Sequence, residues 1–304
     1  MGLANNYVEV AGTVMDVYGY KVMNQGETYE KFEYKMKVKV DENQIFEVKF
    51  SAKISSKLYD GFCTLWDEIK TVAENGEEAD RIKITGKLTN NTYYSKGKLY
   101  EGAEILVNSA KREKDTNKFE NNASFATLGY VLEHNKLEDG TANIRALINE
   151  YSFNGNIKGH ELVFNVKEDV DDYLEFFPVK SVCSLEGMLN NKKVEIQLAE
   201  KDIQDLSTEG TIGTAKKRIE EENERRKKLR EEGLFKDICE LELTGGVSSI
   251  SLDDIEENEY PFTENDIDDM LNGIDERLEK SLDRDKTKNY SYYNDTNIDE
   301  SVPF

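Results

Sequence analysis

Within residues 29–40, YEKFEYKMKVKV, charged and apolar side chains alternate from Lys31 to Val40. The apolar side chains would share one side of this segment, and a row of lysines that includes Lys35, Lys37 and Lys39 would share the other. A period of two residues is that of a β-strand with one buried face and one exposed face. The pattern therefore predicts a sheet whose outer surface carries a line of positive charges.

Four more short segments with turn signals between them complete this part of the chain, at residues 7–18, 44–52, 81–88 and 100–109. The segment at 44–52 adds Lys49 to the outward positions. Between the third and fourth strands there is room for one short helix or a long ordered loop. We expect Phe62 and Trp66 to pack on the core, on the buried side of such a helix. Five strands with a helix after the third predict a closed Greek-key barrel of the oligonucleotide/oligosaccharide-binding (OB) type.

The same order of segments recurs from residue 124 to 204, with the last strand expected at 192–200. Two glycine motifs anchor the comparison: VAGTV is similar to TLGYV near each start, and ITGKLTNN is similar to SLEGMLNN in each fourth strand. Glycine at such positions marks a bend or a bulge at a barrel corner. The chain contains either a duplicated barrel or two unrelated sets of strands with similar geometry, and the double match favours duplication.

The remaining segments are highly charged. Residues 211–233 predict a helix whose basic run at 225–230 could contact DNA, although its interleaved acids favour a self-paired, solvated spacer. Residues 234–304 hold 20 acidic against 6 basic side chains, so most of the net charge of −22 lies in a tail. Apolar residues at helical spacing near 264–282 predict a helix that either folds on a partner or packs on the barrels. The predicted fold is mainly β, with tandem OB-fold barrels at 1–113 and 124–204, then the charged helix and a largely disordered acidic tail at 245–304.

The sequence patterns also argue against several classes of site. Three widely spaced cysteines, two histidines and the lack of a G-x-x-x-x-G-K-[ST] loop disfavour a disulfide frame, a zinc site and nucleophilic or phosphate chemistry. The acids at 169–173 are interpreted as a solvated loop rather than a metal site. No apolar run approaches the roughly 20 residues of a membrane-spanning helix, and no signal peptide is evident. We expect a cytoplasmic protein that is not an enzyme and needs no cofactor or metal.

A loop between the fourth and fifth strands of the first barrel is rich in aromatic and basic side chains. It contains Tyr93, Tyr94, Lys96, Lys98 and Tyr100. Aromatic faces on which bases stack, at roughly 1–3 kcal/mol each, together with cations along the phosphates, bind single-stranded nucleic acid without sequence preference. We therefore expect these five residues and the four outward lysines to form a DNA-binding site.

This loop and its flanking strands resemble the corresponding hairpin of bacterial-type single-stranded-DNA-binding (SSB) proteins. The shared spacing runs through Gly86, Leu88, Tyr93, Gly97, Tyr100, Glu104, Ile105, Val107 and Asn108. By position, Tyr93 takes the place of the stacking tryptophan of that family. The loop is shorter here, a second barrel and a long helix are inserted, and basic residues are few. These departures put the tetramer of the family in doubt, and a homo-oligomer is left open.

The last six residues, DESVPF, resemble the acidic tip of SSB proteins, which ends in Pro-Phe. The matching positions are Asp299, Glu300, Val302, Pro303 and Phe304. An extended backbone, a terminal ring for an apolar pocket and carboxylates for Arg and Lys suit docking onto other proteins. The segment EENEYPF at 256–262 is either a second, internal copy of the tip or a turn in which Phe262 staples the next helix.

The resemblance implies sequence-nonspecific ssDNA binding that protects exposed strands and recruits replication, recombination and repair proteins through the tip. A duplicated chain of this kind would suit a bacterial virus (phage). The alternative is an OB-fold adaptor of a replication complex with little or no nucleic-acid binding. The acidic tail could also lie over the basic face and compete with DNA, so deletion of residues 245–304 is expected to tighten binding at low salt.

Overall fold

The computed structural model of the chain contains two barrels and two long helices. Its described residues are 6–23, 30–90, 92–95, 98–100, 102–113, 119–151, 157–195, 204–207, 212–232, 235–248 and 262–291. The chain divides into one compact unit of residues 1–190 with 239–304 and a second unit of residues 191–238. Within the described ranges, no helix is long and apolar enough to cross a membrane.

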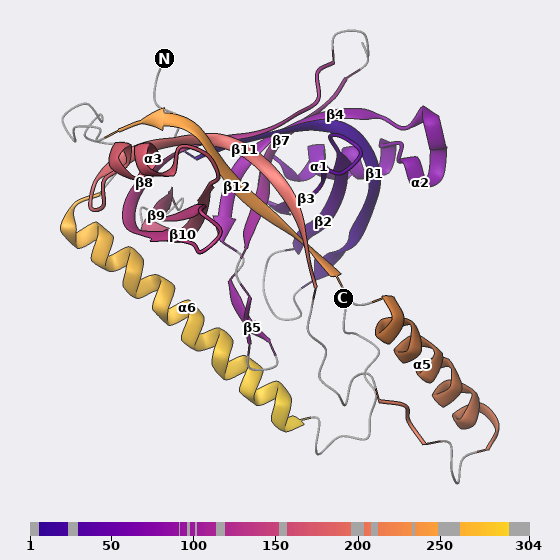
Figure 1. The fold of residues 1–304 in the computed structure, drawn as a ribbon. Helices are drawn as coiled ribbons and strands as arrows, with labels where there is room; N and C mark the ends of the chain where they lie inside the picture. The colour runs from indigo at the N-terminus through magenta and orange to yellow at the C-terminus, as the bar shows by residue number, and fades with distance from the viewer. Residues whose placement is uncertain are drawn as a thin grey trace. The chain divides into compact units, whose positions relative to one another are not determined.

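Five strands close the first barrel (Figure 1). They are β1 (Tyr7–Met23), β2 (Glu30–Lys39), β3 (Ile45–Lys53), β4 (Arg81–Asn90) and β7 (Ala103–Glu113). They pair in the order β1–β2–β3–β7–β4, and β4 pairs back onto β1. The β3–β7 pair is parallel and the other pairs are antiparallel. This is the closed five-stranded barrel that the alternating segments predict.

The predicted inner faces of β2 and β3 form the core of this barrel. Tyr34 is 1% exposed, and its ring stacks on that of Phe50 with 4.4 Å between centroids. Helix α1 (Tyr59–Glu68) lies in the β3–β4 connection, followed by α2 (Val72–Asn75) and the 3-10 turn η1 (Gly76–Glu78). Phe62 of α1 is buried and Trp66 is partly buried against the same core, which confirms their expected packing role.

A second barrel repeats this topology. Its strands are β8 (Asn122–Lys136), β9 (Ala142–Tyr151), β10 (Ile157–Val166), β11 (Val182–Glu195) and β12 (Phe235–Val247). They pair in the order β8–β9–β10–β12–β11, β11 pairs back onto β8, and β10–β12 is the parallel pair. Helix α3 (Val170–Phe176) follows the third strand, so the acids at 169–173 begin a helix rather than a loop.

The strand register confirms the structural repeat. Val8 pairs with Gly86 in the first barrel, and Phe125 pairs with Gly187 at the matching position of the second. A Cβ atom on Gly86 would lie 2.3 Å from the backbone oxygen of Leu106 on β7, and one on Gly187 would lie 1.9 Å from that of Glu242 on β12. Each fourth strand therefore needs glycine at the same crossing with its fifth strand.

The fifth strand of the second barrel differs from the prediction. Residues 192–195 continue β11, whereas the fifth strand is β12, beyond helix α5 (Gly213–Glu232). The second barrel therefore comprises 122–195 and 235–247 instead of ending at 204. The pattern Glu240-Leu241-Glu242-Leu243, in which both leucines are buried, is the signal for this strand.

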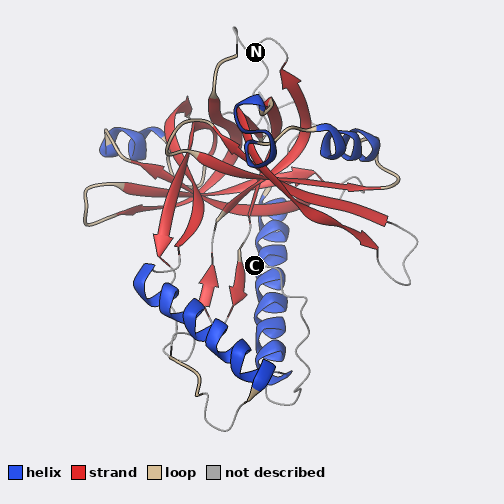
Figure 2. Cartoon of the chain, turned by 90° about the vertical axis from the view of Figure 1, so that its right-hand side faces the viewer, coloured by secondary structure: helices blue, strands red, loops and turns tan. Residues whose placement is uncertain are grey.

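The two barrels share a continuous sheet. Strand β1 pairs with β8 from Tyr7–Ala126 to Ala11–Asn122, and this antiparallel pairing joins the barrels into a ten-stranded sheet. Strand β1 also pairs with β2 and β4, so it belongs both to the first barrel and to the pairing that joins the barrels. A separate two-stranded ladder, β5 (Tyr93–Ser95) with β6 (Lys98–Tyr100), extends away from the barrel strands (Figures 1 and 2).

The acidic tail contains an ordered, docked helix. Helix α6 (Glu264–Ser291) begins after Thr263. The Thr263 hydroxyl accepts a hydrogen bond from the backbone amide of Asp266, and the Asp266 carboxylate accepts one from the backbone amide of Thr263. This is a reciprocal capping box. Phe262 and Met270 are 5% and 1% exposed against the second barrel. Packing on the barrels is therefore the alternative that the structure supports, and Phe262 is a buried anchor rather than an exposed copy of the tip.

Candidate nucleic-acid interface

The outer face of β1, β2 and β3 carries the predicted lysines. Lys35 and Lys49 lie directly opposite each other on β2 and β3, and Lys37 lies opposite Glu47. Lys37 is exposed, and Lys39 at the end of β2 is partly exposed. The four lysines thus share one surface, as the alternation predicts.

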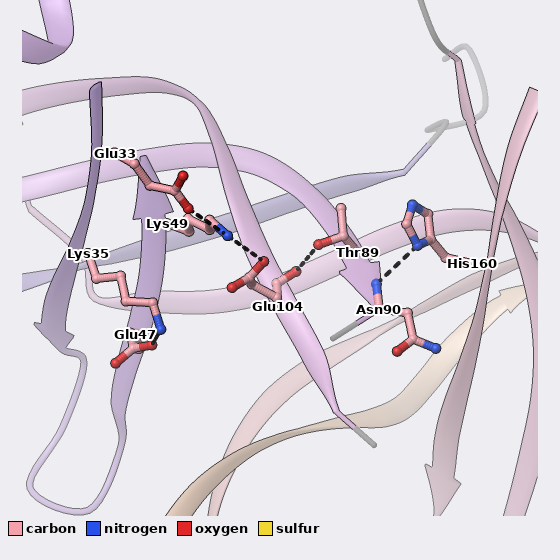
Figure 3. Close-up of polar contacts among 8 residues, drawn as sticks. All are labelled: Glu33, Lys35, Glu47, Lys49, Thr89, Asn90, Glu104 and His160. Carbon is pink, nitrogen blue, oxygen red and sulfur yellow. Dashed lines mark hydrogen bonds and ion pairs between the residues drawn. The ribbon is translucent and has the colours of Figure 1, made fainter. Parts of the chain in front are cut away.

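Carboxylates neutralise two of these lysines (Figure 3). Lys35 Nζ lies 2.5 Å from Glu47 Oε1, and Lys49 Nζ lies 2.8 Å from Glu33 Oε1 and 3.5 Å from Glu104 Oε2. Burial alone would lower the pKa of Lys49, but its two carboxylate partners raise it above the usual value. The face is therefore a mixed network in which Lys49 stays charged, rather than a purely basic strip.

Tyr18 belongs to this face, although the sequence analysis did not single it out. It pairs with Lys35 across β1 and β2, and Lys37 Nζ lies 5.4 Å from the centre of its ring. Its hydroxyl donates to Glu47. Burial of Glu47 alone would raise the pKa of its carboxyl, yet the hydrogen bonds from Lys35 and Tyr18 lower it below the usual value. The signal was the alternation Asp16, Tyr18, Tyr20, which continues the first strand beyond its predicted end.

The predicted aromatic loop forms an arm, which we define as β5 and β6. Tyr93 pairs with Tyr100 and Ser95 pairs with Lys98, so the arm is a short antiparallel ladder between β4 and β7. The side chains of Tyr93 and Tyr94 are partly exposed. Lys96 lies outside the described residues, and Lys98 and Tyr100 are placed by their backbone register alone.

The base of the arm adjoins the lysine face on one side. Glu104, which pairs with Lys49, also pairs in register with Thr89 near the end of β4, and the Thr89 hydroxyl donates to the Glu104 backbone oxygen at 3.3 Å (Figure 3). The face and the arm therefore meet at β4 and β7 of one barrel. Strand 2–3 faces and the loop between strands 4 and 5 are the surfaces with which OB folds bind oligonucleotides.

The base of the arm also contacts the second barrel. The backbone amide of Asn90, the last residue of β4, donates to Nδ1 of His160 on β10 at 3.3 Å (Figure 3). The Asn90 side-chain amide donates to the backbone oxygen of Glu161. Further along the arm, the amide of Tyr94 donates to Oγ of Ser281 on α6 at 2.9 Å. No sequence pattern indicates these contacts, because the two partners of each bond lie 70 to 187 positions apart.

The remaining predicted elements fall into two groups. On α5, Lys216 pairs with Glu220, Lys217 with Glu221 and Arg226 with Glu222, so the helix is self-paired as the interleaved charges favour. The tip residues Asp299, Glu300, Val302, Pro303 and Phe304 lie outside the described residues. In the described part of the chain, no group of three or more His, Cys, Asp or Glu side chains is placed to hold a metal ion.

Comparison with known families accounts for almost the whole chain. The YorF family matches residues 4–283, which include both barrels and most of α6. The chain belongs to the YorF family. No curated protein matches this YorF-family sequence.

Among solved structures, the YorF-family chain is similar to a single-stranded DNA binding protein from Thermus aquaticus. The wild-type protein matches at 12% identity and a TM-score of 0.41, over 62% of this chain and 87% of that one. A deletion mutant of it matches at 13% identity and a TM-score of 0.38, over 63% and 89%. A Replication Protein A heterotrimer bound to ssDNA matches at 12% identity and a TM-score of 0.20, over 62% and 46%. At these scores the likenesses carry no argument about function.

Proposed function

We propose that this YorF-family chain binds single-stranded DNA without sequence preference through its first barrel. The observation that carries the proposal is the junction of two surfaces on that barrel: a face with lysines and Tyr18, and an arm with Tyr93 and Tyr94. Bases would stack on the arm while phosphates follow the lysines. The contact set is the predicted one, Lys35, Lys37, Lys39, Lys49, Tyr93, Tyr94, Lys96, Lys98 and Tyr100, with Tyr18 added.

The charge network assigns unequal roles to the lysines. Lys35 and Lys49 are held by Glu47, Glu33 and Glu104, so a phosphate would have to displace a carboxylate to reach either. Lys37 is exposed and lies beside an aromatic ring. Lys37 and Lys39 therefore supply the first phosphate contacts. Two neutralised phosphates on the face would contribute a slope of roughly −1.4 to log affinity against log salt, at about −0.7 each for single strands.

We further propose that residues 299–304 recruit replication, recombination and repair proteins. The support is chemical: an acidic segment that ends in Pro-Phe with a terminal carboxylate suits an apolar pocket ringed by Arg and Lys. The internal segment ending at Phe262 does not serve this role while that ring is buried against the second barrel.

The test of DNA binding is a titration of oligo-dT with the full chain across a salt series. Replacement of both Tyr93 and Tyr94 by Leu should lower affinity by at least tenfold, because each lost stack costs roughly 1–3 kcal/mol. The matched control is Phe176→Leu, which removes an aromatic ring that is 48% exposed on α3 of the other barrel. Wild-type affinity in the double variant would refute the proposal, as would a wild-type chain that does not bind oligo-dT. The second result would leave the adaptor function as the better hypothesis.

A further inference from the structure

The second barrel offers a different surface from its repeat. Register places Arg145, Asn143 and Asn165 at the positions that Lys37, Lys35 and Lys49 hold in the first barrel. Arg145 is paired with both Glu161 and Glu133. The second barrel therefore lacks the row of lysines at these positions.

Helix α6 packs its apolar side on the outer side of the same barrel, against residues of β8, β9, β10 and β11. Leu128 and Leu147, which are buried on the outside of β8 and β9, form one cluster with Val182, Phe262 and Met270. Inner residues of the same strands, such as Val131 and Ile148, belong to the barrel core. Strands buried on both sides carry consecutive apolar residues, as in Ala146-Leu147-Ile148.

A glycine on β10 allows the helix to approach the sheet. A Cβ atom on Gly159 would lie 2.5 Å from Cβ of Met270, so a larger residue there would displace α6. About two turns further along the helix, the Arg277 guanidinium donates a hydrogen bond to the backbone oxygen of Gly159. Apolar burial and a charge-assisted hydrogen bond thus fix α6 on β10.

In this position on the second barrel, α6 contacts the arm of the first barrel. Ser281, eleven residues after Met270, accepts the amide of Tyr94 at 2.9 Å. The base of the arm is held by His160 and Glu161 of the same strand β10. The second barrel therefore contacts the end of β4 at the base of the arm, and α6 contacts the arm itself at Tyr94.

We propose that the second barrel and α6 form a platform that positions the aromatic arm of the first barrel for single-stranded DNA. This inference rests on the proposed function and deepens it, because it assigns DNA contact to one barrel and positioning to its repeat. Ser281 is a positioning residue: its hydroxyl oxygen accepts a hydrogen bond from the arm backbone at Tyr94. An arm held in place before binding loses less conformational entropy when DNA docks.

The experiment releases α6 in the full chain. Met270→Glu places a charge at a site that is 1% exposed, and Gly159→Val displaces the helix from the opposite side without changing its sequence. The control is Asn272→Glu, which adds the same charge at an exposed position of the same helix. Hydrogen exchange of residues 92–95 reports the arm without DNA, and oligo-dT affinity reports its use.

We expect both releasing variants to exchange faster at residues 92–95 and to bind oligo-dT about tenfold more weakly, the scale of ordering one or two side chains on binding. The control should match wild type in exchange. Ser281→Ala should show the same direction with a smaller change. Unchanged exchange at 92–95 after α6 is released would overturn the platform, and so would a freed arm that binds oligo-dT as tightly as wild type or more tightly. A chain that shows the exchange effect but has no wild-type affinity for oligo-dT refutes the proposed function instead.

Discussion

At the scale of single residues, we expect substitution of Lys37 to weaken DNA binding and substitution of Lys49 to lower folding stability. Lys37→Ala should flatten the salt slope of oligo-dT binding by about 0.7 and leave folding unchanged, because it removes one exposed phosphate contact. Lys49→Ala leaves the carboxylates of Glu33 and Glu104 without their shared cation, and should lower the free energy of unfolding by about 1 kcal/mol. Urea unfolding and the salt series measure the two effects. Equal losses of affinity without a change in stability would mean that phosphate displaces both carboxylates.

The same residues show what the sequence can predict. Alternation correctly placed Lys35, Lys37 and Lys49 on one outer face, because the period of two decides the side of a strand. It could not show that Glu33 and Glu47 on the same face neutralise two of them, since such pairs depend on cross-strand register. The sequence could have placed Tyr18 on this face, because the alternation Asp16, Tyr18, Tyr20 continues past the predicted end of the first strand.

At the scale of elements, β12 is the strand that the sequence analysis misplaced. Leu241 and Leu243 are 1% and 4% exposed, and β12 lies between β10 and β11. A chain that ends at residue 248 should keep the second barrel closed, whereas one that ends at 234 should open it, because β10 and β11 lose their shared partner. Hydrogen exchange of residues 160–166 measures the difference. Both truncations lack α6, so equal protection in the two chains would show that β12 is dispensable.

Helix α6 changes the expectation for the acidic tail. Deletion of residues 245–304 was expected to tighten DNA binding, but that segment includes the ring of Phe262 and the docked helix. Its removal would expose Leu128, Leu147 and Val182 and release the arm, so two effects of opposite sign would be mixed. A chain that ends at residue 291 keeps the docked helix with its own acids and removes only the acids Asp295, Asp299 and Glu300, so its oligo-dT affinity tests competition by these last acids alone. The apolar periodicity predicted the helix. It could not predict the surface on which the helix packs, because β8 and β9 lie more than a hundred residues earlier in the chain.

At the scale of the whole molecule, Glu9 of β1 bonds across the β1–β8 pairing that joins the two barrels, which we call the joint. Its carboxylate accepts hydrogen bonds from Asn122 of β8 at 3.0 Å and from Tyr7 at 2.8 Å, and pairs with Lys83 of β4 at 2.8 Å. Burial of Glu9 alone would raise the pKa of its carboxyl, but the bonds from Lys83, Asn122 and Tyr7 lower it below the usual 4.5. Burial and then the adjacent carboxylate raise the pKa of Tyr7 to about 12, so its hydroxyl remains a donor at neutral pH.

This arrangement predicts that the joint is sensitive to acid. Because the folded-state pKa of Glu9 is lower than the unfolded value, its contribution is fully present above about pH 4.5 and is lost as the pH falls through the folded value. Glu9→Gln should lower the free energy of unfolding by about 2 kcal/mol at pH 7, the scale of hydrogen bonds to a charged group, and by less as the solution is acidified.

Urea unfolding at several pH values gives the difference, and hydrogen exchange of residues 122–126 shows whether the β1–β8 pairing weakens. Glu120→Gln, at an exposed position near the same strand, is the control. A difference that stays constant from pH 7 to pH 3 would show that the ionised carboxylate does not hold the two barrels together.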